Sequence, residues 1–309
     1  MSMRYSILGA GAMGSVFGAR LHLAGFDVEL LNRSKQHSEA IKSNGLEATI
    51  DGYKHTIDIS ACTVEKARIA DVVILFTKTH QIEMALHNMP STLQNASVVT
   101  LQNGLGNGEK VAKQVGDSMT IEGVSMMPAE FIAPGKIESS DAANTWLSSR
   151  LNKNQKLAEQ ICADFNVAGI TTTIEQDIDR LIWQKALFNI GMNALCGLTV
   201  ASPGLLNKLP EAKLLAHEIV DEAMEVAKVK KIKIDQSKVH EMIDFACNNH
   251  VKHKPSMLQD LERGRRTEIE SLNGYIVNLA DKLQVDVPLN RMLNTMVRIK
   301  QESSKFWSQ

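Results

Sequence analysis

Three glycines near the start of the chain constrain its fold more than any other feature of the sequence. Residues 5–8 form a short apolar run, and the pattern Gly-x-Gly-x-x-Gly follows at once with Gly9, Gly11 and Gly14. Apolar residues then recur at helical spacing from residue 12 to residue 24. This order indicates a strand, a tight turn and a helix.

Each glycine has its own physical reason in a turn that binds a dinucleotide. Gly9 permits the tight turn, Gly11 lets the backbone approach a pyrophosphate, and Gly14 lets the helix pack close to the strand. The unpaired N–H groups at the start of the helix then face the phosphates. A turn without a ligand is the alternative, but we predict cofactor contacts at Gly9, Ala10, Gly11, Ala12, Met13 and Gly14.

The end of the second predicted strand indicates which dinucleotide binds. Residues 27–31 are strand-like and lead into Arg33 and Lys35. An acid at this strand end accepts a hydrogen bond from the 2′-hydroxyl of NAD, whereas an arginine accommodates the 2′-phosphate of NADP. Glu29 falls inside the strand rather than at its tip, so Arg33 favours NADP. Solvated surface cations are the alternative.

Two further apolar runs, residues 70–77 and 97–101, are typical of strands that are buried on both faces of a parallel sheet. Lys78 follows the first run and Asn103 follows the second. Because ligands of open α/β sheets bind at the carboxyl ends of the strands, we expect both side chains beside the nicotinamide. A surface lysine and a turn asparagine are the plainer alternatives.

From about residue 177 the sequence changes to long helical patterns with few strand signals. We therefore predict a Rossmann-type α/β dinucleotide-binding domain over residues 1–175 and an all-α domain over residues 176–309. A chain of 309 residues that is 44% hydrophobic is long and apolar enough to bury a core in each domain.

The most informative helix of the second domain spans residues 181–195. Apolar groups lie nearly all the way round it, so this helix should be buried. Lys185, Asn189 and Asn193 are spaced i, i+4 and i+8 and share one face. A buried ammonium group must find partners or have a lowered pKa, as a general acid near neutral pH requires. A lysine that extends to the surface is the alternative.

Two capping-box patterns predict the starts of two successive helices near the end of the chain. Ser256 begins the first pattern and Thr267 begins the second. Glu268 would then stand at the first position of its helix, where the box completed by Glu270 does not need it. The carboxylate of Glu268 can therefore point into a cleft.

The composition argues against several classes of partner. The net charge is −1, with 34 basic and 35 acidic residues, so no overall field attracts nucleic acid or an anionic membrane. No apolar run approaches the ~20 residues of a membrane span, and the strand-like start leaves no signal peptide, so we expect a cytoplasmic protein. We expect no metal, and free thiols at four widely spaced cysteines: Cys62, Cys162, Cys196 and Cys247.

In this order along the chain, the motifs resemble the ketopantoate reductase family, and the match runs from one end to the other. Of the motifs named next, the last two, which begin at Trp183 and at Ser256, are the specific ones. The resemblance rests on the glycine motif, Lys78, Gln102-Asn103-Gly104, Trp183-Gln184-Lys185 with Asn189 and Asn193, and Ser256-Met257-Leu258-Gln259-Asp260 before Arg266-Thr267-Glu268.

The resemblance implies an NADPH-dependent reduction of 2-dehydropantoate (ketopantoate) to pantoate, in the synthesis of pantothenate and coenzyme A. It implies that Lys185 is the general acid at the C2 oxygen and that Ser256 holds the substrate carboxylate. Glu268, which is also expected to contact the cofactor, would bind the hydroxyl and carbonyl groups of the substrate together with Asn189 and Asn193. Lys78 and Asn103 would lie where the nicotinamide meets the substrate.

Two departures from the family pattern concern the substrate. Ala194 stands where the family usually has proline, and His253 stands where asparagine is common. A reductase of another branched 2-oxo acid is therefore an alternative, and a non-catalytic NADP-binding sensor, which would need neither Lys185 nor Glu268, is a second one. We expect a small-molecule 2-oxo acid as the partner, and a homodimer stays an open alternative.

Overall fold

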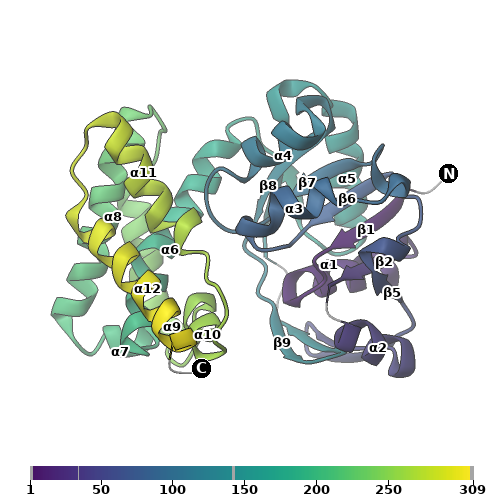
Figure 1. Ribbon diagram of the computed structural model, residues 1–309, viewed down its shortest axis with the longest axis horizontal. Helices are drawn as coiled ribbons and strands as arrows, with labels where there is room; N and C mark the ends of the chain where they lie inside the picture. Colours follow the sequence, from purple (N-terminus) through teal and green to yellow (C-terminus); the bar gives the residue numbers. More distant parts are fainter. Residues whose placement is uncertain (1–2, 34, 141–142, 307–309) are drawn as a thin grey trace. The chain divides into compact units, whose positions relative to one another are not determined.

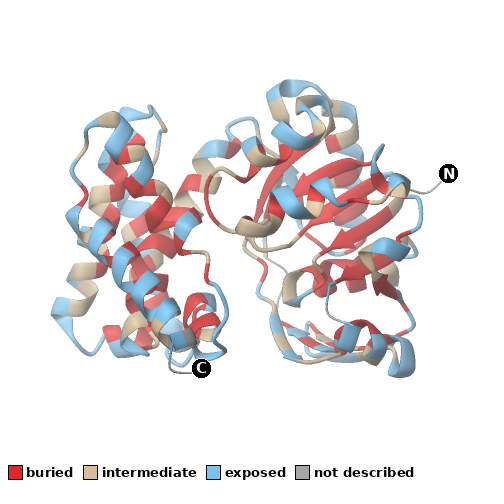
Figure 2. Ribbon diagram, in the orientation of Figure 1, coloured by how far each residue is buried: buried red, intermediate tan, exposed pale blue. Residues whose placement is uncertain are grey.

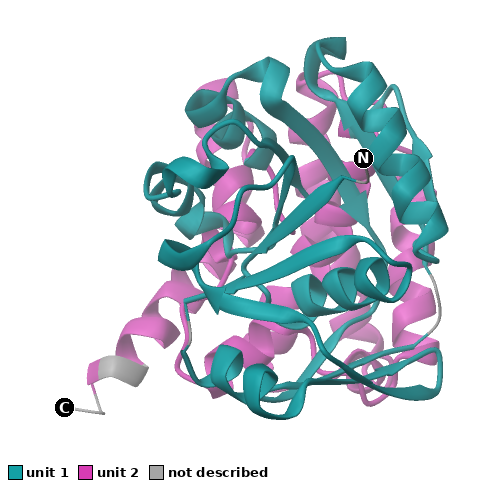
Figure 3. Cartoon of the chain, turned by 90° about the vertical axis from the view of Figure 1, so that its right-hand side faces the viewer, with its two compact units in different colours: residues 1–102, 107–178 teal, residues 103–106, 179–309 magenta. Residues whose placement is uncertain are grey.

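The structure is a computed structural model that describes residues 3–33, 35–140 and 143–306. These residues fall into two compact units, drawn in teal and magenta in Figure 3. The first unit runs up to Gln102 and over Asn107–Ile178, and the second contains Asn103–Gly106 and continues from Asp179. The first is α/β and the second is helical, which confirms the predicted fold class. The division follows Ile178, whereas the sequence places it after residue 175.

The α/β unit is built on a largely parallel sheet whose strand order reverses beside β1 (Figure 1). β1 (Arg4–Leu8) pairs in parallel with β2 (Asp27–Asn32) on one side and with β6 (Val72–Leu75) on the other. In an open α/β sheet, ligands bind outside the carboxyl ends of the strands at such a point. The order is β12-β11-β8-β7-β6-β1-β2-β5, with β5 (Ser60–Thr63), β7 (Ser97–Thr100), β8 (Thr120–Ser125), β11 (Thr145–Ser149) and β12 (Thr172–Ile174).

Helices cover both faces of this sheet. In β6, Val72 and Ile74 belong to one apolar cluster and Val73 and Leu75 to another, because successive side chains of a strand point to opposite faces. Figure 2 shows the central strands as buried. The helices of this unit are α1 (Ala12–Leu23), α2 (Lys35–Asn44), α3 (Ile82–His87), α4 (Asn107–Val115) and α5 (Gln155–Val167), with 3₁₀ turns η1 (Val64–Lys66), η2 (Thr79–Gln81), η3 (Ser91–Leu93), η4 (Asp117–Met119) and η5 (Arg150–Asn152).

A smaller sheet in the same unit has the order β4-β3-β10-β9. The sequence pattern predicts neither this sheet nor β12. The residues of β4 and β9 are mostly exposed or half-buried, and β10 pairs with β3, which is distant in the sequence. The bounds are β3 (Leu46–Ile50), β4 (Tyr53–Ile57), β9 (Glu130–Ala133) and β10 (Lys136–Ser139).

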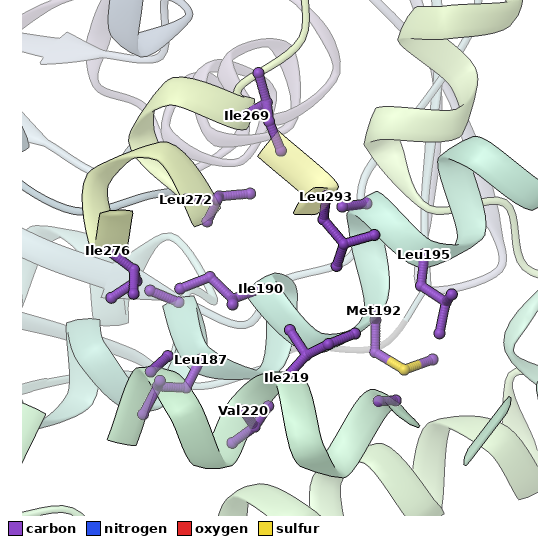
Figure 4. Packing of buried hydrophobic residues seen from close by; sticks show 14 of the residues in the cluster. Leu187, Ile190, Met192, Leu195, Ile219, Val220, Ile269, Leu272, Ile276 and Leu293 are labelled. Carbon is purple, nitrogen blue, oxygen red and sulfur yellow. The ribbon is translucent and has the colours of Figure 1, made fainter. Parts of the chain in front are cut away.

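The helical unit is packed around α6 (Ile178–Thr199), which contains the buried helix that the sequence predicts. Leu187 and Ile190 of α6 lie in its core with residues of the surrounding helices, as Figure 4 shows. The other helices are α7 (Pro203–Leu206), α8 (Pro210–Val229), α9 (Gln236–Asn249), α10 (Ser256–Glu262), α11 (Asn273–Leu283) and α12 (Pro288–Phe306), with the 3₁₀ turn η6 (Ile269–Ser271).

A helix begins at Ser256 as the sequence predicts, but Ser256 is not its cap, and Thr267 does not open an α-helix. Ser256 is the first helical residue of α10, because the carbonyl of Pro255 already accepts the first bond of the helix, from the N–H of Gln259 at 3.2 Å. Thr267 Oγ1 accepts from the N–H of Ile269 at 3.3 Å, but Ile269 begins the short 3₁₀ turn η6 and not an α-helix. Glu268 therefore lies in the segment just before η6.

A buried polar network joins α6 to the helices around it. The side chain of Asn273 donates to the carbonyl of Ile190 in α6 at 3.3 Å and to Asn290 Oδ1 at 3.1 Å. Asn290 Nδ2 in turn donates to Glu222 Oε2 at 3.0 Å. The Glu222 carboxylate also accepts from the backbone N–H groups of Leu289 and Asn290 at 2.9 and 3.0 Å, which caps the start of α12.

Replacing Asn290 tests how much this network holds the helical unit together. Asn290→Ala removes a donor to Glu222 and an acceptor for Asn273, and Asn273 and Asn290 are fully buried. We expect the free energy of unfolding to fall by about 1–3 kcal/mol, measured from the shift of the urea unfolding midpoint. Thr295→Ala on the exposed face of the same helix is the control and should cost less than about 0.5 kcal/mol. Equal effects of the two substitutions would mean that the network contributes nothing.

Candidate active site

The glycine-rich turn after β1 has space for a ligand at one defined point. Gly9 has φ +93°, and a Cβ there would lie 2.6 Å from the backbone nitrogen of Thr77. A Cβ on Gly14 would lie 2.7 Å from the carbonyl oxygen of Gly9. A Cβ on Gly11 would meet none of the described heavy atoms within 4 Å, and Gly11 is exposed. Packing within the protein therefore explains Gly9 and Gly14, whereas the space at Gly11 fits an approaching phosphate.

The start of α1 offers hydrogen-bond donors at the same point. Gly11 is the N-cap of α1, and no described side chain caps it. The backbone N–H groups of Ala12, Met13 and Gly14 belong to the first helical turn, so they have no hydrogen-bond acceptor within the helix. Ala10 is buried. Open space, backbone donors and the positive end of the helix dipole together fit a pyrophosphate.

The end of β2 carries cations rather than an available acid. Arg33 and Lys35 follow β2 and are exposed. Glu29 is 3% exposed, and its carboxylate accepts from the backbone N–H of Arg68 at 2.9 Å and from Arg68 Nε at 3.3 Å. Because Glu29 is bound to Arg68 inside the strand, its carboxylate is held away from the role of a ribose-binding acid.

Gln102, which belongs to the family motif but has no role assigned from the sequence, ties the ends of β6 and β7 together. Gln102 Nε2 donates to the carbonyl of Thr77 at 2.8 Å, and Gln102 Oε1 accepts from Thr100 Oγ1 at 2.6 Å. Lys78, which is half-buried, follows Thr77 directly, and Asn103 follows Gln102. The position of Gln102 after a buried strand was the available signal. Its bonds fix the backbone next to both predicted site residues.

In the helical unit, α6 presents Lys185, Asn189 and Asn193 along one face. Asn189 and Asn193 are 9% and 7% exposed, and Lys185 is half-buried. Burial lowers the pKa of Lys185 from its ordinary 10.5 to about 8, and the charge of Glu268 acts in the opposite direction. The structure thus brings Lys185 and Glu268 within electrostatic reach of each other.

Asn103 lies beside the segment that carries Glu268. The neighbouring Leu105 is in the core of the helical unit and donates its N–H to the carbonyl of Ser271 at 2.9 Å. A Cβ on Gly104 would lie 2.6 Å from Ser271 Oγ, and this hydroxyl donates to the carbonyl of Glu268 at 3.0 Å. The segment Asn103–Gly106 is therefore anchored next to Glu268.

Ser256 begins α10, a helix that packs on α6. A Cβ on Gly197, one turn beyond Asn193, would lie 3.1 Å from Leu261 Cδ1 and 3.5 Å from Met257 Cγ. Ser256 is itself exposed, so its contact with a substrate stays a prediction. Lys185, Glu268, Asn189, Asn193, Asn103 and Ser256 belong to the helical unit, whereas the glycine-rich turn, Arg33 and Lys78 belong to the α/β unit.

Two further properties bear on the kind of site. Across the described residues, no group of three or more His, Cys, Asp or Glu side chains is arranged to hold a metal ion. No helix in the described part of the chain has both the length and the apolar character to span a membrane.

Comparison with known families assigns both halves of the chain. The family model described as "Ketopantoate reductase PanE/ApbA" matches residues 5–152, and the model described as "Ketopantoate reductase PanE/ApbA C terminal" matches residues 177–301. A 2-dehydropantoate 2-reductase of Pyrococcus horikoshii is 31% identical over 97% of this chain and 98% of its own length. One from Lactococcus lactis is 30% identical over 98% and 99%.

Solved structures of the same fold extend the comparison to bound ligands. A D-mandelate dehydrogenase in ternary complex with NADH and anilino(oxo)acetate has a TM-score of 0.91 at 29% identity, covering 97% of this chain and 99% of that one. A PanE/ApbA family ketopantoate reductase from Ralstonia eutropha has a TM-score of 0.90 at 27% identity, covering 98% and 100%. These matches, with the glycine-rich turn, support a nicotinamide cofactor. The chain belongs to the ketopantoate reductase family and is an oxidoreductase that acts on a 2-oxo acid.

Proposed function

We propose that this protein catalyses the NADPH-dependent reduction of 2-dehydropantoate to pantoate, a step toward pantothenate and coenzyme A. The observation that carries the proposal is the face of α6, where Lys185 has a lowered pKa, interacts with Glu268 and precedes two nearly buried amides. The curated relatives named 2-dehydropantoate 2-reductase support the choice of substrate.

The cofactor would be held by the α/β unit. The backbone of residues 9–14 would bind the pyrophosphate, and Arg33 with Lys35 would bind the 2′-phosphate that distinguishes NADPH from NADH. Lys78 and Asn103 would lie where nicotinamide and substrate meet. When bound, the dihydronicotinamide supplies the hydride for the C2 carbon.

The residues of the helical unit would bind the substrate and move the proton. As negative charge develops on the C2 oxygen, Lys185 would donate a proton to it. A pKa of about 8 leaves the amine mostly protonated at pH 7 and makes it a better acid than an ordinary lysine. Asn189, Asn193 and Glu268 would bind the hydroxyl and carbonyl groups, and Ser256 would bind the carboxylate.

Reduction of a different 2-oxo acid is the second candidate. The structural match to a D-mandelate dehydrogenase favours it, because that enzyme was crystallised with anilino(oxo)acetate, in which a carbonyl is attached directly to the carboxylate as in a 2-oxo acid. Ala194 and His253 are positions where this chain departs from the usual family pattern. A panel of 2-oxo acids that includes ketopantoate and phenylglyoxylate, assayed with NADPH and with NADH, separates the two. A non-catalytic NADP-binding sensor would oxidise neither cofactor with any of them.

Lys185→Ala tests the general acid. We expect turnover to fall by about 10²–10⁴-fold with NADPH affinity retained, because the proton donor is lost while the cofactor site is untouched. Wild-type kcat/KM should decline above about pH 8, where Lys185 loses its proton, and this limb should be absent in the variant. Lys185→Arg should rescue little, since a guanidinium releases its proton far less readily. Turnover within a few-fold of wild type would direct attention to Lys78, His253 or a bound water instead.

Glu268→Gln separates substrate binding from helix structure. The KM for the 2-oxo acid should rise and turnover should fall, whereas Tm should change little. Because the Glu268 carboxylate raises the pKa of Lys185, its loss should also move the alkaline limb of kcat/KM to lower pH. Glu270→Gln, an exposed acid in the same segment, is the matched control. A loss of stability with unchanged kinetics would assign Glu268 a structural role.

Arg33→Ala tests the choice of cofactor. Removing a charged donor to the 2′-phosphate should weaken NADPH by about 10- to 100-fold and leave NADH, which lacks that phosphate, nearly unaffected. Dissociation constants from calorimetric titration give the comparison directly. Lys42→Ala, an exposed cation on α2, is the control and should change neither value. A wild-type preference for NADH, or equal weakening of both cofactors, would refute NADP specificity.

A further inference from the structure

A buried histidine connects the two segments that are proposed to hold the phosphates of NADPH. His37 is 3% exposed, and both of its ring nitrogens have partners. The backbone N–H of Gly135 donates to His37 Nδ1 at 2.8 Å, and His37 Nε2 lies 3.3 Å from Ser15 Oγ. The Ser15 hydroxyl, which is fully buried, donates to the carbonyl of Ala10 at 3.1 Å.

The donor and the acceptor of each hydrogen bond around His37 follow from the chemistry of its partners. A backbone N–H can only donate, so His37 Nδ1 must be the unprotonated acceptor of the Gly135 bond. The proton of the neutral ring is then on Nε2, where it points to Ser15 Oγ. Burial holds the pKa of His37 below its ordinary value, which favours this neutral form.

The hydrogen bonds that run from His37 through Ser15 to Ala10 connect two segments of the proposed cofactor site. His37 lies in the first turn of α2, which begins at Lys35, directly after the segment of Arg33. Ala10 lies in the glycine-rich turn, between Gly9 and Gly11. The link therefore joins the cations at the end of β2 to the backbone that faces the pyrophosphate.

Contacts with the smaller sheet fix the position of the His37 side chain. Gly135 forms the turn between β9 and β10, and its carbonyl accepts from the N–H of Glu47 in β3 at 2.8 Å. The ring of Phe131 in β9 packs on His37 with ring centroids 5.0 Å apart. Both contacts hold the imidazole of His37, and with it the first turn of α2, against the smaller sheet.

We infer that His37, acting through Ser15, is a positioning residue that sets the spacing between the glycine-rich turn and Arg33 and thereby the preference for NADPH over NADH. The pyrophosphate and the 2′-phosphate are attached to one ribose, so the groups that bind them must be held at a matching separation. NADH engages only the first of these groups and is less sensitive to the spacing. The inference rests on the proposed cofactor choice and is independent of the substrate.

Ser15→Ala breaks the link without removing His37, and alanine suits the interior of α1. We expect the ratio of the NADPH and NADH dissociation constants to change by about 3- to 10-fold against NADPH. His37→Gln, which keeps a donor near the position of Nε2, should retain more of the preference than His37→Asn, which keeps only an acceptor near Nδ1. Tyr5→Phe is the matched control, because it removes a buried 2.6 Å hydrogen bond to Asp164 in the same unit. It should lower Tm and leave the ratio unchanged.

A mutant cycle decides whether the link acts through Arg33 and Lys35. In the background that carries both Arg33→Ala and Lys35→Ala, Ser15→Ala should produce no further change in the ratio, because both cations whose positions it controls are gone. The inference is overturned if Ser15→Ala leaves the ratio at the wild-type value, or if its effect persists without Arg33 and Lys35. An unchanged ratio in the Arg33→Ala single variant would instead refute the proposed cofactor choice. All titrations use the protein without substrate, so they do not depend on which 2-oxo acid is reduced.

Discussion

The cost of burying a charged amine on α6 is the constraint on which the proposed chemistry of this protein depends. Most of α6 is packed in the apolar core of the helical unit, yet one face carries Lys185, Asn189 and Asn193. Desolvation pulls the pKa of the amine down, and Glu268 limits the fall. A fully solvated lysine would be a poor proton donor near neutral pH, and an isolated buried one would be unprotonated. In the proposed reaction, the balance between these two effects would give an acid suited to an alkoxide that forms at pH 7.

The parts of the site that the sequence predicts are those defined by local spacing. The glycines at 9, 11 and 14 report on one turn, and the i, i+4, i+8 spacing of Lys185, Asn189 and Asn193 reports on one helix, so neither needs long-range information. The smaller sheet depends on the pairing of β3 with β10, which no local pattern records. Ser256 is not the cap that the capping-box spacing predicts, because Pro255 occupies the N-cap position of α10.

Gln102 and His37 have roles that the sequence does not reveal, because each contacts residues far away along the chain. Gln102 bonds to Thr77, and His37 is held by Gly135 and reaches the glycine-rich turn through Ser15. Both are polar side chains whose partners lie in other elements, and each fixes the backbone of a segment that carries a proposed site residue. Such supporting contacts become visible only when the strands and turns are arranged in space.

The central claim is that the pKa of Lys185 is lowered and that Lys185 serves as the proton donor. The most direct measurement is an NMR titration of the Lys185 ε-methylene group in protein with ¹³C-labelled lysine, assigned with the Lys185→Arg variant. The account predicts a midpoint of about 8 that falls further in Glu268→Gln and coincides with the alkaline limb of kcat/KM. A midpoint at the ordinary lysine value of 10.5, unaffected by the loss of Glu268, would contradict it.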